Sequence, residues 1–217
     1  MRMNSARMNP MRTASGIVLM FLMSVAIVPD KMAAQQQAAP PPSKFKVTTS
    51  AYSDEGWIPV QYTCGASDSF VPGLQWMDAP SGAASFAMIF HDTDAAPGKN
   101  AMDVTHWILW NIPGSATQLP ADIKPDTSPD GIVQGKNIRG VNGYQPPCPP
   151  VGSRARPHHY VFELYALDAK LGLAEGSSRA DLLKAMDGHV IGKATVVGIF
   201  GRGVDEASWP WPVTKTQ

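Results

Sequence analysis

The 217-residue chain has few cysteines, no excess charge of either sign and no apolar run long enough to cross a bilayer comfortably. Its two cysteines exclude a disulfide-dense scaffold and a zinc site with four cysteine ligands. Because 18 Lys and Arg residues balance 18 Asp and Glu residues, a strongly basic nucleic-acid binder and an acidic disordered tail are also excluded. Hydrophobic residues make up 44% of the chain and charged residues only 17%, which is enough apolar material for a core.

The first 34 residues have the pattern of an export signal. Three arginines precede the apolar run GIVLMFLMSVAIV at residues 16–28 (Arg2, Arg7 and Arg12). A basic region followed by about 7–15 apolar residues is typical of a secretory signal peptide, whereas a membrane span needs about 20. The alternative is an uncleaved membrane anchor, because no A-x-A cleavage site stands out. We predict a signal peptide over 1–34 and a periplasmic or secreted protein without stable membrane insertion after cleavage.

A polar, proline-rich segment follows the signal. Residues 35–43 (QQQAAPPPS) predict a flexible linker, and the folded domain is expected over 44–217. No internal repeat or Gly/Ser linker divides this region, which favours a single domain. Residues 1–34 contain four basic residues and one acidic residue, which leaves 14 Lys and Arg against 17 Asp and Glu, a formal charge of −3.

Short apolar or alternating runs, separated by Pro, Gly and Asp, recur through the domain and indicate β-strands. Only residues 178–188 predict a helix, with a capping box at the start, an apolar face, and glycine at the end. Many strands and one late helix predict a mainly β sandwich. The expected strands are Phe45–Ala51, Ile58–Thr63, Ser85–His91, Val104–Asn111, Ile132–Asn137, His158–Leu167 and Val190–Phe200.

Histidines lie within two of these strands, and His91 ends a third. The period of two along a strand places His158 and Tyr160 on one face, so they can share a site. The same alternation places His106 and Trp107 on opposite faces. Asp92 and Asp94 follow a third strand, at a point where side chains leave the core and line a rim.

Several motifs follow one another in the domain, from about Phe45 to Gly201. They are DTDAAP at 92–97, THW at 105–107, NIP at 111–113, GY at 143–144, CPPVG at 148–152, HHYVF at 158–162 and LYALD at 164–168. In this order they resemble the phosphatidylethanolamine-binding protein family, and more closely its bacterial Raf-kinase-inhibitor-like branch. The resemblance implies an antiparallel β-sandwich with one or two short helices and a small anion-binding pocket at one end.

The resemblance also implies which residues bind and what they bind. Imidazoles and a tyrosine hydroxyl donate to phosphate or carboxylate oxygens, and an aspartate orients a histidine or accepts from an ammonium group. We therefore expect a non-catalytic protein, without cofactor or metal, that binds a small phosphorylated or carboxylated ligand such as a phospholipid headgroup. The ligand-binding residues expected by motif are Asp92, Asp94, His106, Pro149, Pro150, His158 and Tyr160.

Two other functions stay open at this stage. The protein could inhibit an exported hydrolase or another protein partner through the rim loop 92–100. A metal-dependent hydrolase is a weaker alternative, because His and Asp side chains suit transition metals but the H-E-x-x-H and G-x-S-x-G motifs are absent. The residues considered for that metal are His91, Asp92, Asp94, His106 and His158.

Two further local features are a pair of cysteines and a loop that differs from the family pattern. Cys64 and Cys148 are a candidate disulfide, because export permits pairing; two unpaired buried thiols are the alternative. The family usually has D-P-D-A-P where this chain has D-T-D-A-A-P, with Thr93 in place of proline and Ala96 as an extra residue. The bond between Ala96 and Pro97 is a candidate cis peptide.

Overall fold

The computed structural model describes residues 44–98, 101–119, 123–125, 127, 129–151 and 156–203. The predicted signal peptide over 1–34 and linker over 35–43 lie outside these residues. The described strands are β1 (Lys46–Thr49), β2 (Gly56–Trp57), β3 (Leu74–Met77), β4 (Ser85–Asp92), β5 (Val104–Pro113), β6 (Gln118–Leu119), β7 (Val133–Gln134), β8 (His158–Leu167) and β9 (Val190–Phe200). The helices are α1 (Arg179–Met186) and the 3-10 turns η1 (Val60–Tyr62) and η2 (Pro129–Gly131).

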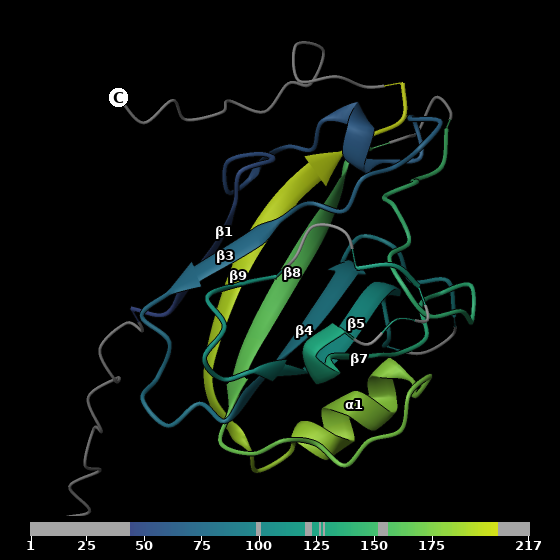
Figure 1. Ribbon diagram of the computed structural model, residues 1–217. Helices are drawn as coiled ribbons and strands as arrows, with labels where there is room; N and C mark the ends of the chain where they lie inside the picture. Colours follow the sequence, from purple (N-terminus) through teal and green to yellow (C-terminus); the bar gives the residue numbers. More distant parts are fainter. Residues whose placement is uncertain are drawn as a thin grey trace, which may run out of the picture. The chain divides into compact units, whose positions relative to one another are not determined.

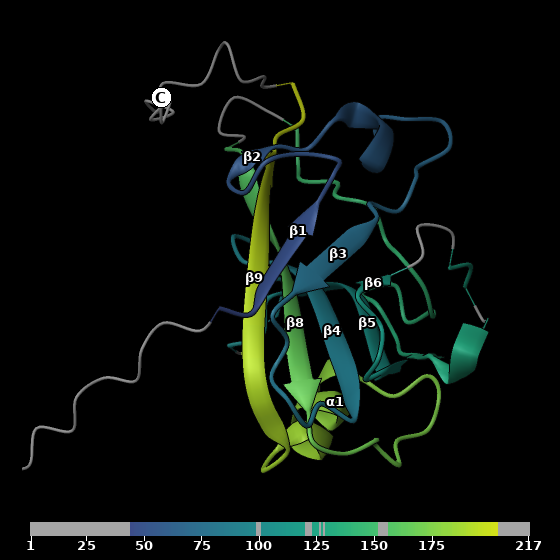
Figure 2. The same ribbon diagram turned by 60° about the vertical axis from the view of Figure 1, so that its left-hand side comes forward.

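The strands form two sheets. One has the order β1-β3-β6 and the other β2-β9-β8-β4-β5-β7 (Figure 1). Strands β1 and β3 cross one face of the six-stranded sheet (Figure 2). The mainly β sandwich is therefore confirmed, although the short β2 runs parallel to β9 and makes the large sheet mixed.

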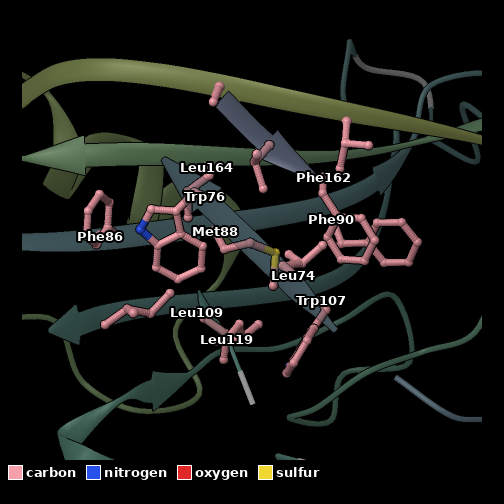
Figure 3. Close-up of a cluster of buried hydrophobic side chains, with 14 of the residues drawn as sticks. Leu74, Trp76, Phe86, Met88, Phe90, Trp107, Leu109, Leu119, Phe162 and Leu164 are labelled. Carbon is pink, nitrogen blue, oxygen red and sulfur yellow. The ribbon is translucent and has the colours of Figure 1, made fainter. Parts of the chain in front are cut away.

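The main core lies between the two sheets. Leu74 and Trp76 from β3 meet Phe86, Met88 and Phe90 from β4 (Figure 3). These side chains are almost fully buried, and burying one large apolar side chain stabilises the fold by about 1.5–3 kcal/mol. The alternation of β4 sends its even-numbered residues into this core.

A smaller core lies on the other face of the large sheet, under α1. Leu182 and Met186 of the helix belong to one cluster with Ile89 of β4 and with Ile108 and Trp110 of β5. The predicted capping box is confirmed: Ser178 Oγ accepts from Asp181 N, and the Asp181 carboxylate accepts from Ser178 N. The helix thus starts where the sequence predicts.

One expected strand is wrong. Residues 60–62 within Ile58–Thr63 form the turn η1, in which Thr63 N donates to the carbonyl of Val60 at 3.0 Å. Only Ile58 joins the large sheet, through its amide and the Ile199 carbonyl. A short apolar run does not by itself distinguish a strand from a turn. The cis peptide expected at Ala96–Pro97 is also wrong, because no peptide bond of the described residues is cis.

A β-bulge changes the faces of β5. The register pairs Phe90 with Trp107 but His91 with Thr105, so His106 is an extra residue on β5. Its ring lies 5.5 Å from that of Phe90, on the side of the main core that also receives Trp107. The alternation rule placed His106 and Trp107 on opposite faces, and the bulge overturns that prediction.

Candidate functional site

Four predicted site residues meet at one end of the large sheet. Because β4 runs antiparallel to both β5 and β8, the end of β4 lies beside the starts of the other two strands. Asp92 is paired directly with Tyr160 across the sheet. We call Asp92, His106, His158 and Tyr160 the His/Asp cluster.

Asp92 and His158 form the closest pair of the cluster. The Asp92 carboxylate lies 2.7 Å from His158 Nδ1, and its other oxygen accepts from the amide of Asp94 at 3.0 Å. The side chain of Asp92 is only 4% exposed, whereas that of His158 is 15% exposed. The carboxylate therefore fixes the orientation of an imidazole at the edge of the core, which is a common way of holding a functional histidine.

His106 is oriented from a distant part of the chain. Its Nδ1 atom lies 2.7 Å from the backbone carbonyl of Gln145, and its own carbonyl accepts from the amide of Gln145 at 2.9 Å. The ring is 4% exposed. Burial lowers the pKa of His106, against the opposing effects of the Gln145 carbonyl and the Asp92 charge. No sequence motif indicates the role of Gln145, which depends on a contact across 39 residues.

Tyr160 lies between the two imidazoles. Its ring is 5.3 Å from that of His106, edge to face, and 6.4 Å from that of His158, nearly parallel. Burial, followed by the negative charge of Asp92, raises the pKa of the hydroxyl far above its usual value. The hydroxyl is buried and has no well-aligned hydrogen-bond partner among the described residues, although the Asp92 carboxylate and the Cys148 backbone both lie near enough to interact with it.

Asp94 belongs to a different contact. One oxygen accepts from the backbone amide of His159 at 2.7 Å and lies 2.8 Å from its Nδ1 atom. Both side chains are well exposed. Burial alone would raise the pKa of Asp94, but the hydrogen bonds from His159 lower it overall. Asp94 thus links the end of β4 to the start of β8. Its described hydrogen bonds do not connect it to the imidazoles of the cluster.

The proline-rich segment 145–150, called the wall below, meets the cluster through Gln145, which binds His106, and through the Cys148 backbone, which interacts with the Tyr160 hydroxyl. No contact of Pro149 or Pro150 with the cluster is found among the described residues. Pro149 is buried and Pro150 is exposed. Cys148 forms a disulfide with Cys64, and the Cys64 amide donates to the Pro147 carbonyl at 3.0 Å. The wall is consequently tied to the segment around η1 although the two cysteines are 84 residues apart.

A separate ionic network lies on the opposite face of the large sheet. His91 Nδ1 lies 2.7 Å from the Asp103 carboxylate, which also binds Arg179 at the start of α1. Glu163 accepts from Tyr165 at 2.6 Å and from Lys193 at 2.5 Å. The sequence did not predict this network. The network lies behind the strand ends that carry the cluster.

A hollow on the protein surface lies elsewhere. It measures about 370 Å³ and is lined by residues 45–49, 52–54 and 193–196, along β1 and β9. Two of its charged groups are already engaged, since Asp54 accepts from Val197 N and Lys193 donates to Glu163. Within the described ranges, no three His, Cys, Asp or Glu side chains are grouped to hold a metal ion. No helix among these residues is long and apolar enough to cross a membrane.

Comparisons with known proteins agree with the fold. A family model described as phosphatidylethanolamine-binding protein matches residues 48–201. A relative from Methanothermobacter thermautotrophicus, named only UPF0098 protein, is 45% identical over 161 residues, which cover 73% of this chain and all of that protein. The crystal structure of a Chlamydia trachomatis homologue of phosphatidylethanolamine-binding protein superimposes with a TM-score of 0.64 at 34% identity. That match covers 74% of this chain and 99% of the other.

One further relative bears on cellular location. A Mycobacterium tuberculosis protein named as a candidate lipoprotein, LppC, is 33% identical over 163 residues. The match covers 75% of each chain.

Proposed function

Because this chain belongs to the phosphatidylethanolamine-binding protein family, we propose that it binds a small phosphorylated or carboxylated ligand at the His/Asp cluster without converting it. The proposal includes a zwitterionic headgroup such as phosphoethanolamine among the ligands. It assigns direct contacts to His106, His158 and Tyr160, and an orienting role to Asp92.

The Tyr160 hydroxyl is the observation that carries the proposal, because it is buried and has no well-aligned hydrogen-bond partner. More than about 90% of buried polar groups in proteins have such a partner, and leaving one unpaired costs about 1–3 kcal/mol. The Asp92 carboxylate and the Cys148 backbone interact with this hydroxyl, but neither reaches full hydrogen-bond geometry. The hydroxyl, beside two oriented imidazoles, therefore supports a ligand that accepts a hydrogen bond from it.

A zwitterionic ligand suits the mixture of charges in the cluster. Phosphate or carboxylate oxygens accept from the Tyr160 hydroxyl and from a protonated imidazole. The Asp92 carboxylate repels an anion, but its charge is partly offset by the His158 Nδ1–H group that it holds. An ammonium group on the ligand would offset it further, which is the reason for testing phosphoethanolamine beside phosphate.

Export completes the proposed setting. The basic and apolar pattern of residues 1–34 supports a cleaved signal, and the Cys64–Cys148 disulfide fits an oxidising compartment. The name of the related M. tuberculosis protein points the same way. We therefore place the binding function in the periplasm or outside the cell.

Calorimetric titration of the purified protein with phosphoethanolamine and with inorganic phosphate tests the proposal. We expect saturable binding, and a loss of affinity of at least about tenfold in His158→Ala, because a hydrogen bond to a charged group contributes about 1.5–3 kcal/mol. His189→Ala is the matched control, since His189 makes a similar 2.8 Å pair with Asp168 at the other end of β8. Absence of saturable binding by the wild type would overturn the proposal.

The ligand recovered after incubation tests the non-catalytic part. Mass spectrometry should find it chemically unchanged. Stoichiometric or greater conversion would instead favour an enzyme. A protein inhibitor would show itself differently, through capture of a defined exported partner that competes with phosphoethanolamine.

A further inference from the structure

We propose that the His/Asp cluster takes up one proton from solution with each anion and prefers a phosphate monoester, whose oxygen can share that proton with an imidazole, to a phosphate diester, whose oxygens are too weakly basic to share it. The inference rests on the proposed function, because it concerns the ligand of the same site. It follows from the hydrogen bonds of the two imidazoles, because the Nδ1 atom of each ring is already bonded to another group of the protein.

His106 has its Nδ1 proton engaged. The partner is the Gln145 carbonyl oxygen at 2.7 Å, and a carbonyl oxygen only accepts. Nδ1 must therefore carry a hydrogen in every protonation state of the ring. In the neutral ring the only hydrogen on nitrogen is this one, so Nε2 presents a lone pair and accepts.

His158 is constrained in the same way by a different group. Its Nδ1 atom lies 2.7 Å from the Asp92 carboxylate, and an ionised carboxylate also only accepts. The neutral His158 ring thus also presents a lone pair at Nε2. The motifs predict that both histidines donate to an anion, but in the neutral form each presents an acceptor at Nε2.

The neutral cluster is consequently poor at holding an anion. Its one side-chain donor without a well-aligned partner is the Tyr160 hydroxyl, while two imidazole lone pairs and the Asp92 charge disfavour phosphate oxygens. One added proton, shared between an Nε2 atom and a phosphate oxygen, replaces a repulsive contact by a charge-assisted hydrogen bond. Binding and proton uptake are therefore linked.

The groups that face each imidazole decide when the proton arrives. Asp92, Asp103 and His91 act on His106, and its burial outweighs the two carboxylates, so its pKa is lowered. Asp92, Asp94 and Tyr160 lie near His158. The free protein near neutral pH thus holds His106 uncharged, and the proton enters with the ligand.

The same constraint separates monoesters from diesters. A phosphate monoester has a second ionisation with a pKa near 6, so close to neutrality it can carry a P–OH hydrogen toward an Nε2 lone pair. At pH 7.5 the monoester is mostly ionised and this hydrogen comes from solution, but it can rest on the phosphate oxygen or be shared with Nε2. A diester oxygen is far less basic, so the proton must rest on an imidazole, and burial disfavours that for His106. The cluster should therefore select a terminal phosphate over a phosphate that links two groups.

Calorimetry in two buffers of different ionisation enthalpy, HEPES and Tris, measures the proton count directly. For phosphoethanolamine at pH 7.5 we expect uptake of about one proton per ligand, and an affinity that falls up to about tenfold per pH unit above this pH. Glycerophosphoethanolamine, the matching diester, should bind at least about tenfold more weakly.

Asparagine variants locate the proton. In His106→Asn and His158→Asn the side-chain amide takes the place of Nδ1 and can keep its hydrogen bond, while the titrating Nε2 atom is gone. At least one of them should still bind but lose the proton uptake. His189→Asn, which removes an exposed imidazole paired with Asp168, should change neither quantity.

The outcomes separate this inference from the proposed function. Tight binding without proton uptake, a diester bound as well as the monoester, or uptake that survives both cluster variants would each overturn the inference and leave headgroup binding intact. Absence of any binding by the wild type would overturn both.

Discussion

Single atoms decide what the His/Asp cluster can bind. His106 and Asp92 are nearly buried, yet each is held by a specific partner: the Gln145 carbonyl for the imidazole, and the His158 ring for the carboxylate. The Tyr160 hydroxyl has no well-aligned partner. The two imidazoles are thus held by groups of the protein itself, which reduces the ordering cost when a ligand binds.

Acid should destabilise the protein through His106. Its pKa is lower in the folded than in the unfolded protein, so its contribution is complete above about pH 6.5 and is lost as pH falls through the folded value. Urea unfolding of the wild type and of His106→Asn at pH 7.5 and 5 checks this. The variant should lose less stability between the two pH values. Equal losses would show that His106 is not buried in the neutral form.

Asp94 should differ from Asp92 in its effect on binding. Asp94→Asn weakens an exposed pair with His159, so it should cost no more than about 1 kcal/mol and leave ligand affinity within about twofold. Asp92→Asn removes the charge that orients His158 and should alter affinity much more. Calorimetric titration of both variants tests the distinction. Similar losses of ligand affinity in both would mean that Asp94 also belongs to the binding site.

Residue patterns predicted some of these roles but not all. The pairing of His158 with Tyr160 on one face followed from the alternation of a regular strand. The face of His106 did not, because a bulge is a property of the paired register and not of one strand. The role of Gln145 was also invisible, since it depends on how the proline-rich wall packs against β5.

At the scale of elements, the long central strands were the most predictable. The bounds of β8 and β9 match the sequence prediction, because both have ten or more residues with consistent burial and strand-forming composition. The short β3 and β6 of the small sheet were missed. Two to four residues carry too little pattern to reveal a strand that forms only by packing over a larger sheet.

The start of α1 offers a test that is independent of the site. Ser178 caps the helix and shares a reciprocal bond pair with Asp181. Ser178→Ala should reduce the free energy of unfolding by about 0.5–2 kcal/mol while ligand affinity stays unchanged. Denaturant unfolding measures the first quantity and calorimetry the second. A stable variant with altered binding would mean that α1 communicates with the cluster.

At the scale of the whole molecule, one covalent link joins distant segments. The Cys64–Cys148 disulfide closes a long loop and ties the wall beside the cluster to the segment around η1. The unfolded, unreduced protein should contain no free thiols when titrated. Reduction should destabilise the fold by about 2–5 kcal/mol through chain entropy. Two free thiols in the native preparation would contradict the link.

Ligand binding is also coupled to the stability of the whole molecule, because affinity and stability make opposite demands on Tyr160. Its hydroxyl costs stability while it is unpaired and contributes affinity once a ligand accepts from it. Tyr165 on the same strand supplies the matched control: it faces the other side of the sheet, and its hydroxyl donates to Glu163 at 2.6 Å.

Ligand binding at the cluster is tested by measuring phosphoethanolamine affinity and unfolding free energy together for Tyr160→Phe and Tyr165→Phe. Tyr160→Phe should bind about 10–100-fold more weakly with unchanged or increased stability. Tyr165→Phe should lose stability and keep its affinity. A Tyr160→Phe protein that binds like the wild type would contradict the account, because the cluster would then not be the site at which the ligand is held.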